Sequence, residues 1–297
     1  MEWLQRNSSG PIKTGFLFIS TFFIAFLQFG VAGIQKTLYI NRGVFTCVNG
    51  NTFPFLAFND SAVYSSQNSV INIRTSDTLF IKVINNDTVL HGFSVDGYPS
   101  INALINPGDS LMDTLVPQGE RLYIFYDHHL YPKNRYMGLG GMICVNNSTT
   151  AKKYYWNLKE HSKKISDTLS VGGQVNWRLY EPDYFTINGW SHPDLENDTT
   201  AKINVNLGDT VYIFVINTGQ SAHALHFHGF HVKTLFSTRS YQIGWVKDSY
   251  PLHRMDGVVL ELVPDKVGKY SVHDHNLVAV QGGGTHPNGM FTIMEIQ

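Results

Sequence analysis

Apolar, β-branched stretches bounded by polar turn residues recur along the chain. The clearest are residues 77–86 (DTLFIKVINN) and 209–218 (DTVYIFVINT), and each predicts a β-strand that ends in a turn. Gly, Pro, Asn and Asp residues separate such stretches from their neighbours, which is typical of sandwiches with Greek-key connections. The pattern therefore predicts an all-β protein.

The two strands belong to a longer repeat. In both copies a Leu-Val-Pro tripeptide stands eleven residues before a histidine, His128 in the first copy and His275 in the second, and a Gly-Met pair follows. A unit of this length that occurs twice predicts two similar β domains rather than a solenoid. We place the first domain at residues 36–160, with a linker from about residue 149, and the second at residues 161–297.

The amino terminus is first cationic and then apolar. Arg6 and Lys13 precede an uncharged stretch from Thr14 to Gln35. This stretch is long for a signal peptide and just long enough to span a bilayer, and its terminal position and basic flank disfavour the alternative of a buried core helix. We interpret residues 1–35 as a signal peptide or a membrane anchor. The remaining chain is then exported and faces the periplasm or the extracellular space.

Composition narrows the chemistry. The chain has 22 Lys and Arg against 23 Asp and Glu, so it lacks the broad basic face that nucleic acid requires. It has 13 histidines and only 2 cysteines, so imidazole rather than thiolate carries any metal chemistry. Cys47 and Cys144 have no C-x-x-C spacing, which excludes a zinc ribbon or thioredoxin-like motif. They form either one disulfide or two buried thiols.

The second domain holds the densest histidine pattern, in the segment HALHFHG at residues 223–229. Residues two apart on a strand share a face, so His226 and His228 are expected to offer ring nitrogens to one region. His273 and His275 repeat the alternation, and a neighbouring strand would place the two pairs opposite one another. The sequence therefore predicts four convergent imidazoles, a ligand set suited to a metal ion.

These motifs resemble those of the multicopper oxidase family, and the layout resembles two-domain cupredoxins such as the copper nitrite reductases. The resemblance covers most of residues 60–297 and implies two cupredoxin-like Greek-key β-sandwich domains that bind copper. It implies, by position, metal ligands in the type 1 slots His223, His286 and Met290, in the type 2 slot His226, and in the type 3 slots His228, His273 and His275.

The departures from the family pattern concern the type 1 centre and the first domain. Asp274 stands where the family has its type 1 cysteine, and Asp127 is its counterpart in the first domain, so no blue copper centre is expected. These two catalytic candidates are either oxygen ligands and proton relays or, the reading we favour, hydrogen-bond partners that orient the histidines.

In the first domain His91 and His128 are the remaining metal-ligand candidates. Val89 and Tyr126 replace two of the family's histidines there. We therefore expect one or two copper ions per site rather than three.

The resemblance implies a copper-dependent oxidoreductase whose metal lies between a first and a second domain contributed by neighbouring subunits of a homotrimer. Without a type 1 centre, an electron donor or a partner protein would have to reduce the histidine-bound copper directly. The substrate would be a small molecule such as dioxygen or nitrite. The alternative from another class is a non-enzymatic copper carrier or a structural cupredoxin subunit of the cell envelope. A zinc or iron site made by the same histidines is a third reading.

Overall fold

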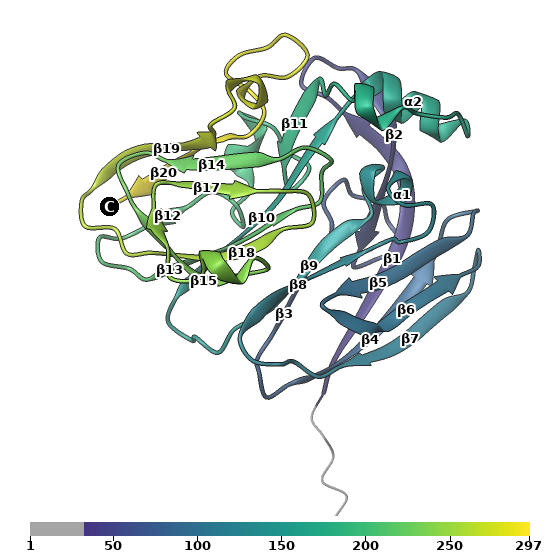
Figure 1. The fold of residues 1–297 in the computed structure, drawn as a ribbon, viewed down its shortest axis with the longest axis horizontal. Coiled ribbons are helices and arrows are strands. Elements are labelled where there is room, and N and C mark those ends of the chain that lie inside the picture. Colours follow the sequence, from purple (N-terminus) through teal and green to yellow (C-terminus); the bar gives the residue numbers. More distant parts are fainter. Residues whose placement is uncertain (1–32) are drawn as a thin grey trace, which may run out of the picture. The chain divides into compact units, whose positions relative to one another are not determined.

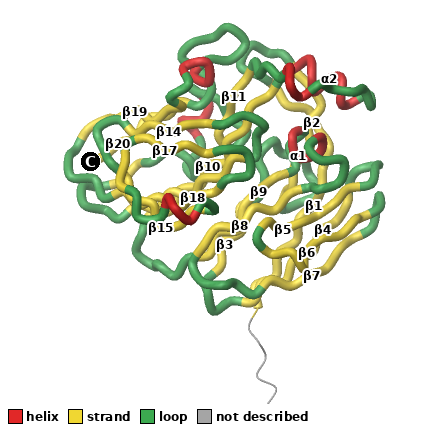
Figure 2. Tube along the Cα trace, in the orientation of Figure 1, coloured by secondary structure: helices red, strands yellow, loops and turns green. Residues whose placement is uncertain are grey.

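The computed structural model describes residues 33–297, so nearly all of the predicted leader or anchor lies outside the described residues. Strands dominate the described part, and its helices are few and short (Figure 2). None of the helices within residues 33–297 has the length and apolar character needed to cross a bilayer. The all-β prediction is confirmed.

The amino-terminal half forms a β-sandwich of two sheets. Its strands are β1 (Gly33–Thr46), β2 (Thr52–Asn59), β3 (Val70–Ile73), β4 (Thr78–Asn85), β5 (His91–Asp96), β6 (Tyr98–Ile105), β7 (Ser110–Leu115), β8 (Arg121–Tyr126) and β9 (Gly140–Val145). One sheet has the order β2-β1-β4-β7 and the other β3-β9-β8-β5-β6 (Figure 1). Alternate side chains, Phe93 and Phe125 among them, fill the core between the sheets. The short helix α1 (Lys133–Tyr136) lies between β8 and β9.

The carboxy-terminal half repeats this plan. Its strands are β10 (Lys152–His161), β11 (Tyr184–Ile187), β12 (Asn204–Val205), β13 (Val211–Asn217), β14 (His223–Phe227), β15 (Val232–Ser237), β16 (Val246–Lys247), β17 (Ser249–Leu252), β18 (Gly257–Leu262), β19 (Gly268–Asp274) and β20 (Phe291–Ile296). The sheet orders are β11-β10-β13-β18-β15-β16 and β12-β20-β19-β14-β17. Trp156 and Phe227 stack in the core between them.

Helical segments of the second half are short. They are α2 (Lys163–Ser170), η1 (Trp177–Leu179), η2 (Asp194–Asn197), η3 (Ser240–Gln242) and η4 (Leu277–Val280). The stretch that we interpreted as a linker from about residue 149 contains β10 and α2. Because β10 pairs with β11 and β13, this stretch is part of the second sandwich's sheet.

An apolar layer joins the two sandwiches. Leu122 and Ile124 of β8 alternate with Tyr123 and Phe125, so they point away from their own core and pack with Phe214 of β13. Polar contacts lie beside this layer. The buried Arg135 guanidinium of α1 donates hydrogen bonds to the carbonyl oxygens of residues 218 and 219.

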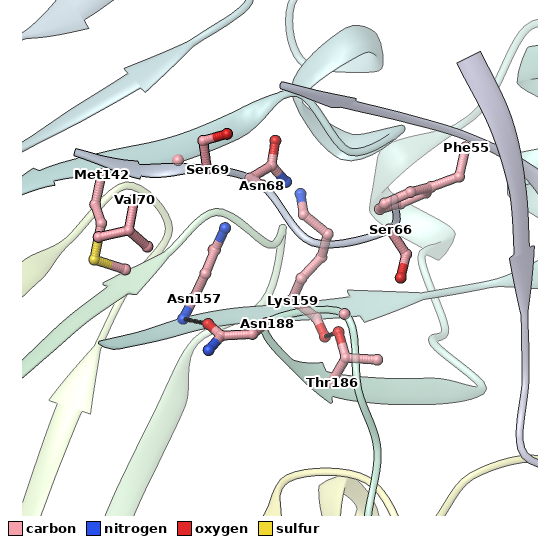
Figure 3. Close-up of a pocket in the computed structure, with 12 residues that line it drawn as sticks. Phe55, Ser66, Asn68, Ser69, Val70, Met142, Asn157, Lys159, Thr186 and Asn188 are labelled. Atoms are coloured by element: carbon pink, nitrogen blue, oxygen red, sulfur yellow. Dashed lines mark hydrogen bonds between the residues drawn. The ribbon is translucent and has the colours of Figure 1, made fainter. Parts of the chain in front are cut away.

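A narrow pocket beside this junction holds Lys159 of β10, with Asn68 and Thr186 nearby (Figure 3). The Lys159 ammonium donates to the Arg135 carbonyl at 2.8 Å and to the Thr218 carbonyl at 3.0 Å. Burial and the nearby Arg135 charge hold the pKa of Lys159 well below its usual value. A residue that lines the pocket thus connects β10 to both halves through hydrogen bonds.

Both cysteines are buried free thiols. Cys47 packs among Phe45, Phe53 and Phe55, whereas Cys144 packs in the layer between the sandwiches. Of the two alternatives left open by the sequence, the structure has the thiols.

Candidate metal centre

Strand alternation divides the histidines of the second sandwich between two faces. His223 and Asp274 are buried, while the neighbouring positions are half-buried or exposed. The outward group comes from β14 and β19 and from the residue that follows each of them. We call it the outer histidine cluster; its members are His226, His228, His273 and His275.

The four outer rings gather in one place, as the alternation predicted. β14 and β19 are antiparallel neighbours, and His226 is directly opposite His273. The ring centroid of His226 lies 4.7 Å from that of His228, 5.7 Å from that of His273 and 5.3 Å from that of His275. The Nε2 atoms of His228 and His273 are 2.9 Å apart. Register and pleat therefore bring together residues that are up to 49 positions apart in the sequence.

Neighbouring groups orient two of these rings. His273 Nδ1 donates a hydrogen bond to the Asp274 carbonyl at 2.8 Å, so the lone pair of the neutral ring is on Nε2. His226 Nδ1 lies 2.9 Å from the Ser249 hydroxyl on β17. Burial and the neighbouring imidazoles lower the pKa of His228. The neutral form of the ring, which is the form that binds metals, is thereby favoured.

The donor chemistry of the outer histidine cluster fits copper. Two nitrogens that lie about 2.0 Å from one ion at a right angle are about 2.8 Å apart, close to the observed separation of His228 and His273. Within residues 33–297, however, no group of three or more His, Cys, Asp or Glu side chains is arranged to hold an ion. The cluster therefore offers a pair of nitrogens at ligand spacing and two further rings beside it.

The inward face carries a different arrangement. His223 Nδ1 lies 2.5 Å from Asp274 Oδ2, and His223 Nε2 lies 2.9 Å from Glu160 Oε2. Carboxylates only accept, so both ring nitrogens donate and the ring is an imidazolium. We call these three residues the second-domain clamp.

Burial alone would lower the pKa of His223. The hydrogen bonds and charges of Asp274 and Glu160 outweigh burial and raise that pKa to about 9. Burial would likewise raise the pKa of Glu160, but the bonds from His223 and from the backbone N–H groups of Ser221 and Gln220 lower it to about 2. The clamp is therefore charged at neutral pH.

The first sandwich holds an equivalent clamp. His91 Nδ1 lies 2.7 Å from Asp127 Oδ2, and His91 Nε2 lies 2.8 Å from Asp87 Oδ2. Arg42 of β1 forms a two-bond ion pair with Asp87. Burial alone would lower the pKa of His91, but Asp127 and Asp87 raise it. We call His91, Asp87 and Asp127 the first-domain clamp.

The backbone explains why the clamps correspond. His91 stands fourteen residues after Asp77, and His223 stands fourteen after Asp209, so the repeat aligns the two rings. The outer positions align as well, because Ser94 is opposite Tyr126 in the first sandwich as His226 is opposite His273 in the second. The first sandwich thus presents different residues at the four outer positions: Ser94, Asp96, Tyr126 and His128.

The structure separates the metal-ligand candidates into groups. His91 and His223 are in the clamps, where both nitrogens of each ring are bonded to carboxylates. Met290 is buried in the core of the second sandwich, and its carbonyl accepts from the Asp274 N–H. His286 lies in an exposed loop and donates from Nδ1 to the Val280 carbonyl at 3.1 Å. Among the residues proposed for the type 1 slots, His223 thus has both ring nitrogens bonded to carboxylates, and His286 has Nδ1 bonded to a carbonyl.

The catalytic candidates Asp127 and Asp274 are both fully buried and each holds a clamp histidine. Each also accepts backbone N–H groups on either side: Asp127 from Gly92 and His129, and Asp274 from Ala224 and Asn276. Each aspartate thus accepts hydrogen bonds from a histidine ring and from the backbone, and its orienting role toward metal-binding histidines stays a prediction.

The sequence reasoning missed the second carboxylate of each clamp. Asp87 lies in a turn between two strands, and Glu160 lies in the stretch interpreted as a linker. Only the strand pairing places Glu160: Leu158 pairs with Asn217 as Ile40 pairs with Asn85, so Glu160 occupies the position that Arg42 has in the first sandwich.

Comparisons with known proteins show which proteins this chain resembles. A family model described as multicopper oxidase matches residues 149–286. The fold resembles a blue copper oxidase from Nitrosomonas europaea, with a TM-score of 0.74 and 22% identity over 88% of this chain and 85% of that one. It also resembles the multicopper oxidase mgLAC, with a TM-score of 0.73 and 20% identity over 89% and 86% of the two chains.

A copper nitrite reductase from Nitrosomonas europaea has the same fold, with a TM-score of 0.69 and 16% identity over 89% of this chain and 94% of that one. No curated protein matches the sequence. The resemblance to multicopper oxidases and two-domain cupredoxins is thus confirmed by the family model and by the fold. The predicted pair of cupredoxin-like domains is confirmed with it.

Proposed function

We propose that this protein is an exported copper-dependent oxidoreductase that acts on a small molecule at the outer histidine cluster. The observation that carries the proposal is the convergence of four imidazoles on one face, with Nε2 atoms of His228 and His273 at ligand spacing. The multicopper oxidase family match over residues 149–286 supports copper as the ion. The proposed ligands are His226, His228, His273 and His275.

When bound, copper would supply Lewis acidity and one-electron chemistry toward a ligand such as dioxygen or nitrite. The chain's own residues prepare the place for it. The backbone carbonyl of Asp274 accepts a hydrogen bond from His273 Nδ1, and the Ser249 hydroxyl fixes the His226 ring. Orientation by such partners raises metal affinity because the rings need not be ordered on binding.

The chain lacks the residue combination of a blue electron-entry centre. Asp274 occupies the cysteine position, and Glu160 and Asp274 take both ring nitrogens of His223. We propose that an electron donor approaches the exposed outer histidine cluster directly. In that case the electron donor and the substrate would both bind at the outer histidine cluster.

We further propose that the site is completed in a homotrimer. The outer histidine cluster brings the Nε2 atoms of His228 and His273 to ligand spacing, and we propose that groups from a neighbouring subunit complete the coordination. The corresponding outer face of a neighbour's first domain offers Asp96, Tyr126 and His128. His128 Nδ1 lies 2.8 Å from the Ser94 hydroxyl, which leaves its Nε2 for an ion.

The test is copper content, oligomeric state and turnover measured on one preparation. Wild-type protein loaded with Cu(II) and dialysed should retain copper near stoichiometry by elemental analysis and should elute as a trimer. His273→Ala should abolish retention, whereas His253→Ala, which changes an exposed histidine in a turn, should not. Absence of retained copper in the wild type would refute the proposal.

Oxygen or nitrite consumption with an artificial electron donor separates the enzyme from its alternative, a copper carrier of the cell envelope. Turnover that disappears in His273→Ala supports the oxidoreductase. Stoichiometric copper without turnover on either substrate would favour the carrier, whose support is the exposure of His228 and His275 to solvent.

A further inference from the structure

The second-domain clamp connects three strands beneath the outer histidine cluster. His223 is on β14 and Asp274 on β19, both in one sheet, while Glu160 is on β10 of the facing sheet. All three side chains are at most 3% exposed. The imidazolium of His223 therefore links both sheets of the sandwich, next to the positions on β14 and β19 that carry the outer rings.

Asp274 transmits this position to the strands themselves. Its Oδ2 bonds to His223, and its Oδ1 accepts from the backbone N–H of Ala224 at 3.2 Å and of Asn276 at 2.9 Å. Asp274 lies between His273 and His275 in the sequence, so a shift of its carboxylate would move the backbone that carries both outer rings. The distance between the two histidine pairs thus depends on this carboxylate.

Backbone hydrogen bonds fix the position of the Glu160 carboxylate. Its Oε1 accepts from the N–H groups of Gln220 and Ser221 at 2.5 and 2.7 Å, which leaves Oε2 for His223. Gly219 makes room for it, since a Cβ atom there would overlap Glu160 Oε2. The carbonyl of Gly219 accepts from Arg135 of the first sandwich. The local chain is therefore shaped around this carboxylate.

We propose that His223, Glu160 and Asp274 are positioning residues for the outer histidine cluster. Their charged cross-link takes the place of an ion at the inner position and fixes β19 against β14, so that the outer rings stay within reach of one metal ion. This proposal rests on the proposed copper-binding function. The carboxylate of Asp256, which bonds to Arg239 at 2.6 Å and to the backbone N–H of His253, forms another ion pair of the second sandwich, so this pair provides a control for a general loss of stability.

The test compares Glu160→Gln and His223→Gln with the controls Asp256→Asn and Arg239→Gln in the full chain. Glu160→Gln retains an acceptor for Gln220 and Ser221 and removes only the charge toward His223, so it is the variant expected to fold. Cu(II) affinity is measured by competition with a chelator, and electron paramagnetic resonance of the Cu(II) form reports the ligand geometry.

Glu160→Gln and His223→Gln should weaken Cu(II) binding about 10- to 100-fold and change the resonance spectrum. The two control variants should leave affinity within about twofold and the spectrum unchanged, because residues without shared partners act independently. An unchanged affinity and spectrum in folded Glu160→Gln would overturn the proposal. So would an equal change in the controls, since the effect would then be a general loss of stability.

A metal-free measurement keeps this test separate from that of the proposed function. In protein with isotope-labelled histidine, the nuclear magnetic resonance signals of His226, His228, His273 and His275 should shift in Glu160→Gln and stay in place in Asp256→Asn. If the wild type binds no copper, the proposed function fails, while shifted signals would still support the positioning role. Unmoved signals would overturn it.

Discussion

The charge on His223 predicts how stability depends on pH. Its pKa is raised from 6.5 to about 9, so the folded protein holds this proton more tightly than the unfolded chain does. The stabilisation is therefore complete below pH 6.5 and is lost as pH rises toward 9. One pH unit corresponds to about 1.4 kcal/mol per proton, so the loss across this window is about 3 kcal/mol.

The assay is urea unfolding of metal-free protein at both ends of that window, in the wild type and in His223→Gln. The wild type should lose about 3 kcal/mol more than the variant, with similar denaturant slopes. The raised pKa of His91 acts in the same direction in both proteins, so it cancels in the comparison. Any loss common to both proteins is thereby removed.

Removing one partner of a buried ion pair destabilises a protein by about 3 to 5 kcal/mol, so His223→Gln is expected to be less stable already at pH 6.5. A titration of isotope-labelled wild-type protein by nuclear magnetic resonance gives an independent reading of the His223 ring. Equal pH dependence in wild type and variant would refute the reasoning, as would a His223 ring that loses its proton near pH 6.5.

Three further predictions concern Gly219, the two cysteines and the absorption of the copper-loaded protein. Gly219→Ala should lower the free energy of unfolding by about 3 kcal/mol, because a Cβ there displaces Glu160 from His223; an unchanged urea midpoint would show that Glu160 is not fixed. A thiol reagent should label Cys47 and Cys144 only after unfolding without reductant, since burial raises the pKa of Cys47 to about 12 and that of Cys144 well above its usual value; no labelling of the unfolded chain would indicate a disulfide. Copper-loaded protein should show no intense blue absorption, because Asp274 replaces the thiolate; such a band would contradict the assignment of that position.

Hydrophobic periodicity was sufficient to predict an all-β chain, because strand alternation and turn residues are local signals, whereas the cupredoxin-like architecture was implied by the family resemblance. The same alternation predicts the outer histidine cluster, since His226 and His228, like His273 and His275, are two residues apart. Strand alternation also distinguishes inward from outward residues, which the family motif does not. His223 is three residues from His226, and Asp274 lies between two outward histidines, so His223 and Asp274 both point inward. Odd or even spacing along a strand thus predicted which histidines lie together better than the match to the family motif did.

Glu160 illustrates what sequence patterns do not contain. Its place in the clamp depends on the parallel pairing of β10 with β13 and on the space left by Gly219, neither of which is a local property. In the first sandwich the second carboxylate of the clamp is Asp87, which lies in a turn and bonds to His91. Arg42, at the position that corresponds to Glu160, pairs with Asp87. Two different residue sets therefore build one arrangement, and no shared motif marks it.

The inward and outward residues of each sandwich differ in their bonding partners, and this difference supports our proposal for where chemistry takes place. Both inner positions hold an imidazolium between two buried carboxylates, so each already contains a cation with its charge partners and has no free ring nitrogen for an ion. The outer positions differ between the halves: imidazoles in the second, and a hydroxyl, a carboxylate, a phenol and one imidazole in the first. Because the second set offers several neighbouring imidazoles near solvent, it supports our proposal that metal binds at the outer histidine cluster and that the second-domain clamp positions that cluster.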